Sequence, residues 1–345
     1  MPIARSLFSK GSKITVNSEA EYADLSEQAR ANKALARILP YTEGGNSSIQ
    51  EKLGYARREQ EKRLREGLKL LDTTQEICQG LGIPYVVIKS LDALPDLGHD
   101  IDLLVGKNLV RVRDELLKRL RCSPVTLTFC DRQAGKFSTF IQGYDFDFEL
   151  YARITQMGEE YYPEETVLQN RNYIPAINGG TYLCSNEDRL LITCIHTMYR
   201  HQKIRLSDLN IAFEAFRQDL DLQRVLQTVE SAGIQKGFAV FMSVLRKTAQ
   251  NSTGKNILPR EVDAYIENTL YSDPVIARMT RRLKDSFPLK IPLALSICLF
   301  LYKAWADASK TRLNSFLRSL AAPVLLVMDK SVPYGIQKRM SVRIW

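Results

Sequence analysis

The sequence predicts an α+β protein in which a small mixed-sheet core lies between a helical N-terminal lead-in and a helical C-terminal half. Residues 48–80 are rich in helix formers, short strand-like segments follow up to residue 184, and the remainder has the character of helices and loops. We therefore expect a helical lead-in over 1–80, an α/β core over 81–184 and a helical region over 185–345.

The long helix predicted over 48–80 follows a cluster of turn formers at 42–48. Its Glu, Lys, Arg, Gln and Leu residues favour helix, although Gly54 and Gly67 weaken it locally. Gly80 and Gly82 are expected to end it. Its apolar positions can share one stripe: Leu53, Leu64, Leu68, Leu71 and Ile77.

The core should contain several short strands and one helix over 109–120. A helical turn is expected at 90–94, and Ser185 is expected to cap a helix that runs to about residue 200. No strand is expected after residue 184. The predicted strands are 85–88, 100–105, 125–129, 137–141, 145–151, 173–177 and 181–184.

Composition favours a globular protein with reduced thiols. The apolar fraction is 45%, and the six cysteines include no Cys-x-x-Cys pair. The start of the chain lacks the pattern of a signal peptide. The apolar run 291–302 is short for a bilayer span, which needs about 20 residues, so it is expected to form a buried helix. We expect a cytoplasmic protein without a transmembrane segment, with peripheral membrane association as the alternative.

Positive charge is concentrated near the end of the chain. Residues 286–345 hold nine basic residues and two acidic ones, Asp307 and Asp329, in a chain of net charge +9. This excess suits an anionic partner such as RNA, an acidic membrane surface or a polyphosphate. The alternative is a solvated basic face without a partner.

The string Asp100-Ile101-Asp102-Leu103-Leu104-Val105 is the most informative in the chain. Side chains alternate along a strand, so Asp100 and Asp102 point to the same face. Two carboxylates beside apolar residues repel each other, and a divalent cation resolves that repulsion. Hard oxygen ligands favour Mg²⁺ or Mn²⁺.

A second acidic strand is predicted at 145–151, where Asp145, Asp147 and Glu149 share one face. If the two strands are neighbours, one of these acids can join Asp100 and Asp102 around the metal. The alternative is that all five acids are solvated residues at a strand edge.

Basic and hydroxyl side chains complete the predicted site. Lys89 and Ser90 follow a buried strand, where a helical turn could offer backbone N–H groups, the Ser90 hydroxyl and the Lys89 charge to a phosphate. Arg200 and Arg205 could reach a triphosphate from the helical half. The alternatives are a capped turn with a solvated lysine, and an Arg205–Asp208 pair beside a packed histidine, His196.

The order of a strand, a turn with serine, an Asp-x-Asp strand and a later acidic strand resembles the polymerase-beta-type nucleotidyltransferase superfamily. Lys89-Ser90, with Gly82, Ile83 and Pro84 before it, resembles the uncharacterised bacterial and archaeal branch, as do Asp188, His196, Arg205 and Asp208. The resemblance covers about 48–213. It implies that Asp100 and Asp102 are metal ligands, that Asp147 is the third metal-binding carboxylate and a general base, and that Ser90 binds phosphate. Lys89 departs from the glycine more common in the superfamily.

The function expected from these observations is metal-dependent transfer of a nucleoside monophosphate from an NTP, such as ATP, to an unidentified acceptor. An inactive member of the same fold is an alternative. A second enzyme class, glycosyl transfer, also uses Asp-x-Asp to hold a metal and a nucleotide sugar. A non-catalytic module that binds RNA or a membrane through the basic C-terminal region is the non-enzymatic alternative.

Overall fold

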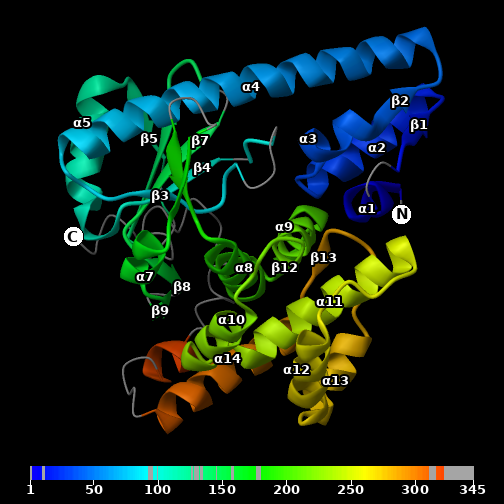
Figure 1. The fold of residues 1–345 in the computed structure, drawn as a ribbon, viewed down its shortest axis with the longest axis vertical. Helices are drawn as coiled ribbons and strands as arrows, with labels where there is room; N and C mark the ends of the chain where they lie inside the picture. The colour runs from blue at the N-terminus through cyan, green and yellow to red at the C-terminus, as the bar shows by residue number, and fades with distance from the viewer. Residues whose placement is uncertain are drawn as a thin grey trace.

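The computed structural model confirms the α+β class, with a seven-stranded mixed sheet in the middle of the chain and a helical C-terminal region (Figure 1). Among the helices described, none is both long enough and apolar enough to cross a bilayer. The structure describes residues 2–9, 12–91, 96–98, 100–125, 127, 132, 135–144, 146–156, 159–175, 180–310 and 316–321.

The lead-in ends in the predicted long helix, α4 (Ser47–Gly80), which runs along one side of the molecule in Figure 1. Asn46 caps it by accepting a hydrogen bond from the backbone N–H of Ile49 at 3.0 Å. Before α4 lie elements that the sequence did not predict, including a parallel two-stranded sheet. They are α1 (Pro2–Phe8), β1 (Ile14–Val16), α2 (Glu19–Ala31), α3 (Leu35–Ile38), η1 (Leu39–Tyr41) and β2 (Thr42–Gly44).

The sheet has the strand order β10-β11-β3-β4-β7-β6-β5. Strand β4 (Ile101–Leu104) lies between β3 and β7, and it runs parallel to β7 (Asp147–Tyr151). Both strands that carry the predicted acids are therefore direct neighbours. The other elements of this unit are β3 (Val86–Val87), η2 (Gly106–Asn108), α5 (Leu109–Arg119), β5 (Cys122–Pro124), β6 (Lys136–Ile141), β10 (Asn172–Ile174) and β11 (Thr181–Leu183).

Several details differ from the prediction. The strand expected at 125–129 lies earlier, at β5, and residues 126 and 128–130 are outside the described residues. The turn expected at 90–94 is described only to Leu91, whose left-handed φ of 61° is not helical. Besides β1 and β2, four strands were missed, two of them after residue 184. They are β8 (Ile154–Gln156), β9 (Glu159–Tyr162), β12 (Lys203–Ile204) and β13 (Leu289–Lys290).

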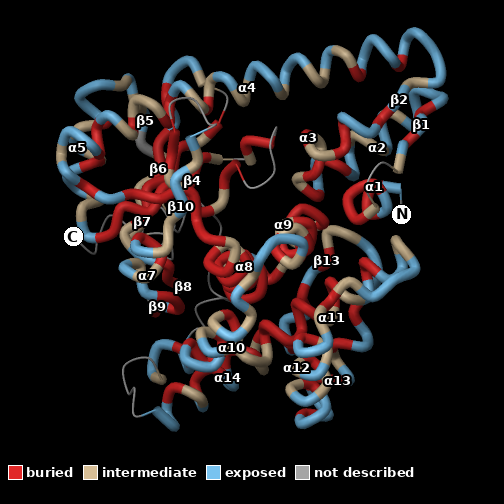
Figure 2. The backbone as a smooth tube through the Cα atoms, in the orientation of Figure 1, coloured by how far each residue is buried: buried red, intermediate tan, exposed pale blue. Residues whose placement is uncertain are grey.

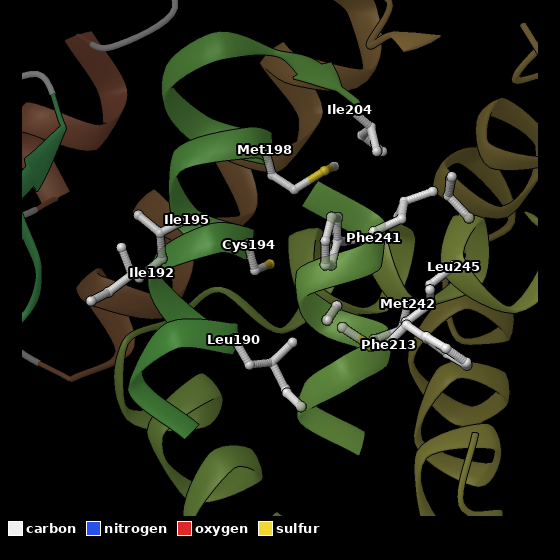
Figure 3. Packing of buried hydrophobic residues seen from close by; sticks show 14 of the residues in the cluster. Leu190, Ile192, Cys194, Ile195, Met198, Ile204, Phe213, Phe241, Met242 and Leu245 are labelled. Carbon is white, nitrogen blue, oxygen red and sulfur yellow. The ribbon is translucent and has the colours of Figure 1, made fainter. Parts of the chain in front are cut away.

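The helical region packs against the sheet through α8 (Asn186–Ile195), which Ser185 caps as predicted by accepting from the backbone N–H of Asp188. Figure 3 shows apolar side chains of α8 meeting those of α9 and α11, and Figure 2 shows that these helices are largely buried. The remaining elements are α7 (Glu164–Gln169), η3 (His196–His201), α9 (Leu206–Phe216), α10 (Leu222–Ser231), α11 (Gln235–Thr253), α12 (Arg260–Tyr271), α13 (Pro274–Arg281) and α14 (Leu293–Ser309).

The two faces of the sheet belong to different apolar clusters. Val87, Leu103 and Leu150 pack with α4 and α5, whereas Val86 and Leu104 join the core formed by the lead-in and the helical region. The acid-bearing strands are thus covered on both sides. This double packing fixes β4 and β7 rigidly in place.

The two glycines of α4 provide a matched test of this packing. Gly54→Ala should raise the melting temperature, because alanine removes a propensity cost of about 1 kcal/mol and its Cβ meets only Arg58, at 3.4 Å. Gly67→Ala should raise it less or lower it, since the new Cβ would lie 2.5 Å from Cδ2 of Leu97. Equal stabilisation by both variants, followed by thermal circular dichroism, would contradict the packing of α4 against the Leu97 segment.

Candidate functional site

Three carboxylates from the two neighbouring strands form one cluster. Asp100 precedes β4, Asp102 lies within it, and Glu149 lies directly opposite Asp102 in the parallel pairing with β7. One ligand oxygen from each of the three lies within 4.8 Å of the others. Asp102 and Glu149 are buried and Asp100 is half-buried, so their mutual repulsion is only weakly screened by water.

The third acid of this cluster is Glu149 and not the predicted Asp147. Asp147 is described and half-buried, but it lies outside the cluster, and Asp145 is outside the described residues. The reason is the register. In the observed pairing Glu149 lies directly opposite Asp102, whereas Asp147 lies two residues nearer the start of β7. The alternation of side chains predicted that Asp145, Asp147 and Glu149 share one face of the strand. It does not give the register with β4, which decides which of the three lies beside Asp102.

Two lysines balance the charge of the cluster. Lys89 Nζ lies 2.8 Å from Asp102 Oδ1, and Lys136 Nζ lies 2.6 Å from Glu149 Oε1. The Tyr151 hydroxyl donates to Glu149 Oε2 at 2.6 Å and accepts from Lys89 at 3.1 Å. The Lys89–Asp102 contact lacks hydrogen-bond geometry, and Asp102 Oδ1 is buried without any hydrogen bond. A buried carboxylate oxygen that contacts an ammonium group without a hydrogen bond fits a divalent cation in place of the ammonium.

Ser90 is placed differently from the prediction. It is only 2% exposed, and its hydroxyl donates to the backbone carbonyl of Asp100 at 2.7 Å. The same oxygen accepts from the backbone N–H of Asp102 at 3.1 Å. A hydroxyl has one proton to donate, so it cannot also donate to a phosphate. Ser90 instead joins the turn after β3 to the two aspartates and fixes their position.

The cluster opens into a cavity of about 330 Å³ that is lined almost entirely by polar side chains. The lining comes from the lead-in, the sheet and the helical region, and it includes the predicted Lys89, Arg200 and Arg205. Its basic members are Lys33, Arg37, Lys89, Lys136, Arg200 and Arg205, and its acidic members are Asp96, Asp100, Asp102, Glu149 and Asp208.

Arg37 connects the walls of the cavity. Its guanidinium forms a buried ion pair with Asp96, 2.7 Å apart, and contacts the side chain of Asn210 in α9 at 3.0 Å. Asp96 also accepts from the backbone N–H of Gly98 at 2.9 Å. One arginine of the lead-in therefore holds both the segment before Asp100 and the helix across the cavity.

Backbone strain is concentrated around the same cavity. Within the described residues, the non-glycine residues with positive φ are Lys33, Leu91 and Gln202, at 50°, 61° and 47°. Lys33 lines the cavity, Leu91 follows Ser90, and Gln202 follows the cavity residue His201. Such conformations cost about 1–3 kcal/mol each and cluster at functional sites. Lys33 was not predicted, because no sequence pattern relates it to the acids.

A π-helical turn, η3, places His196 and His201 in contact at the cavity wall, with ring centroids 4.2 Å apart. Residues five apart diverge on an α-helix, whereas a turn with i→i+5 hydrogen bonds brings them together. Single π-turns are frequent at functional sites. Asp208 contacts Arg205 as a helix cap. Its carboxylate accepts a hydrogen bond from the backbone N–H of Arg205 at 2.8 Å.

Burial and nearby positive charges both lower the pKa values of these two imidazole rings. Desolvation, followed by the charges of Arg200, Arg205, Lys89 and Lys33, lowers the pKa of His201 to about 2. Desolvation, with Lys89 as the next cause, lowers the pKa of His196 well below its usual value. Burial also lowers the pKa of Lys33, although Asp100 opposes this effect. Both imidazoles are therefore neutral at physiological pH.

The mixed sheet thus carries three clustered carboxylates at a cavity that six basic side chains also line, a combination of charges that suits phosphate groups beside carboxylates. A model of the uncharacterised nucleotidyltransferase family matches residues 21–250, and the chain belongs to this family. The match confirms the predicted resemblance, and it includes every residue that lines the cavity. No curated protein matches the chain, and no solved structure does.

The histidine pair gives a prediction for proton NMR, since the chain has only three histidines. His196 and His201 should remain neutral as the pH is lowered from 8 to about 5. Inorganic triphosphate should raise the pKa of both rings, because it neutralises the cations that depress it. Gln substitutions would assign the signals. Titration near the ordinary value of about 6.5 in the free protein, or no response to triphosphate, would contradict this account.

The lowered pKa values of His196 and His201 make the stability of the fold depend on pH. Below the ordinary histidine pKa of about 6.5, the unfolded chain binds protons at these rings that the folded chain does not bind. Acidification through this window should therefore lower the free energy of unfolding. His201→Gln should weaken that dependence in urea titrations at several pH values.

Proposed function

We propose that this protein transfers a nucleoside monophosphate from an NTP to an acceptor oxygen, and that it requires Mg²⁺ or Mn²⁺. The observation that carries the proposal is the convergence of Asp100, Asp102 and Glu149 within 4.8 Å at a cavity lined with basic side chains. Family membership favours nucleotidyl transfer over the glycosyl transfer that Asp-x-Asp also permits.

In this proposal Asp100, Asp102 and Glu149 hold the cation, and Asp147 does not. The bound cation would offset the charge of the triphosphate and favour ionisation of the attacking hydroxyl. The acceptor hydroxyl loses its proton to solvent and its oxygen bonds to the α-phosphorus. The bond between the α-phosphorus and the oxygen that bridges to the β-phosphate breaks, and pyrophosphate leaves. The acceptor is not assigned; RNA, a protein side chain, a metabolite and a lipid head group all offer such an oxygen.

The cations of the cavity have two roles here. Lys89 and Lys136 neutralise Asp102 and Glu149 when no metal is bound. A metal held by the three acids would neutralise Asp102 in place of Lys89, and the Lys89 ammonium would then be available to a triphosphate oxygen. Lys33, Arg200 and Arg205 approach from the other walls and bind phosphate oxygens.

The two acids of β7 provide the sharpest test. Glu149→Gln should reduce Mn²⁺-dependent transfer of label from an α-labelled NTP by at least about 100-fold, because it removes a charged ligand. Asp100→Ala and Asp102→Ala should do the same. Asp147→Asn, on the same strand and face, should leave transfer within about twofold of wild type.

Because the acceptor is unassigned, the assay should supply a cell extract as the acceptor source, with each of the four NTPs in turn. Binding of a non-hydrolysable NTP by calorimetry provides a readout that needs no acceptor. Thermal melts establish that each variant folds. Equal loss in Asp147→Asn and Glu149→Gln, or no loss in either, would refute the assignment of the third acid.

Lys33 gives a second prediction. Lys33→Met should weaken binding of the non-hydrolysable NTP by about tenfold, since it removes one charged phosphate contact, equivalent to about 1.4 kcal/mol. Lys13→Met is the matched control, because Lys13 belongs to the same lead-in but is exposed and pairs with Glu43. Equal effects of the two variants would show that Lys33 acts only through net charge.

A further inference from the structure

Helix α14 lies on the side of the molecule opposite α4 (Figure 1). It buries its charged residues together with Leu295, Leu299 and Phe300, and it leaves other apolar residues exposed. Its only charged residues, Lys303 and Asp307, are 2% and 1% exposed. Its exposed face carries Leu301, Tyr302 and Trp305, the last of which is 71% exposed. The sequence predicted a buried helix here, but the structure leaves one apolar face of it in solvent.

A satisfied polar cluster holds the helix in this orientation. Lys303 Nζ lies 2.5 Å from Glu159 of β9 and 3.0 Å from Asp307. The hydroxyl of Ser319 donates to Glu159 and lies 3.2 Å from Oδ2 of Asp307, and Lys303 also lies over the ring of Tyr161 at 4.7 Å. Turning α14 to hide its apolar face would expose these groups and break the buried ion pairs, which costs several kcal/mol.

A second exposed apolar segment packs on the other side of α14. Ser319 anchors the short helical segment 316–321 to the buried Asp307, and Leu317 and Leu320 of this segment are exposed. A hollow of about 600 Å³ lies beside Leu301, Tyr302 and Trp305, and Lys236 borders it with its ammonium 5.1 Å from the ring of Tyr302. Contiguous exposed apolar surface with aromatic residues marks an interaction site.

The charge around this face selects the partner. Lys236 borders the hollow and Lys310, directly after α14, is exposed, whereas the one carboxylate of α14, Asp307, is buried. A second copy of the chain would bring like charges together, which disfavours self-association. An anionic lipid surface complements the charge, and its head-group region favours tryptophan and tyrosine.

We propose that the exposed face of α14 binds an anionic membrane surface. Trp305, Tyr302 and Leu301 enter the head-group boundary, and Lys236 and Lys310 attract acidic lipids. This places the protein at a membrane without a spanning helix. It does not depend on the proposed reaction, because the residues lie outside the cavity and α14 lies beyond the family match.

Tryptophan fluorescence tests the proposal on the full-length chain. The two tryptophans are Trp305 and Trp345, so Trp345→Phe leaves Trp305 as the single reporter. Phosphatidylglycerol-containing vesicles should shift its emission to the blue, whereas phosphatidylcholine vesicles should not. In co-sedimentation, Trp305→Glu and Leu301→Glu should each lower binding at least about tenfold. Tyr55→Glu, at an exposed position of α4, should not change it.

Several results would overturn the proposal. These are absence of binding to the anionic vesicles, equal binding to both kinds of vesicle, and undiminished binding of Trp305→Glu. Emission of Trp305 that is already blue-shifted without vesicles would mean that another part of the chain covers the face. A dimer in analytical ultracentrifugation that Trp305→Glu dissociates would assign the face to a second copy.

Discussion

The repulsion between three closely placed carboxylates is the constraint that organises this molecule. Asp102 and Glu149 are opposite each other on adjacent parallel strands, and Asp100 adds a third charge at the strand end. Buried charges of one sign are tolerated only when opposite charges balance them. In the structure Lys89 and Lys136 provide this balance. A metal ion could provide it instead, and this exchange of partners connects the structure with the proposed chemistry.

The fold is arranged to keep that cluster in place at the meeting point of three parts of the chain. Ser90 fixes the aspartates from the turn after β3, and Arg37 joins the lead-in to the segment around Asp96 and to α9. The same requirement to satisfy buried charge acts at the far side of the molecule. There, Lys303 and its two carboxylate partners determine which face of α14 is left exposed.

The sequence was sufficient for the features that depend on local pattern. It predicted the long helix α4, the acid-bearing strands and the placement of Asp100 and Asp102 on one face, since periodicity and composition encode these. It could not choose Glu149 over Asp147, because register is set by the partner strand. It missed Lys33 and the π-turn that joins His196 to His201. Both depend on backbone geometry that only tertiary packing enforces. The division into 1–80, 81–184 and 185–345 remains a prediction.

The most direct test of the central claim is a crystal structure with Mn²⁺ and a non-hydrolysable NTP, with manganese located by its anomalous scattering. We expect an anomalous peak in contact with carboxylate oxygens of Asp100, Asp102 and Glu149, with the Lys89 ammonium moved from Asp102 toward the triphosphate. An NTP bound in the cavity without manganese at these three acids, and with Lys89 still paired with Asp102, would contradict the account.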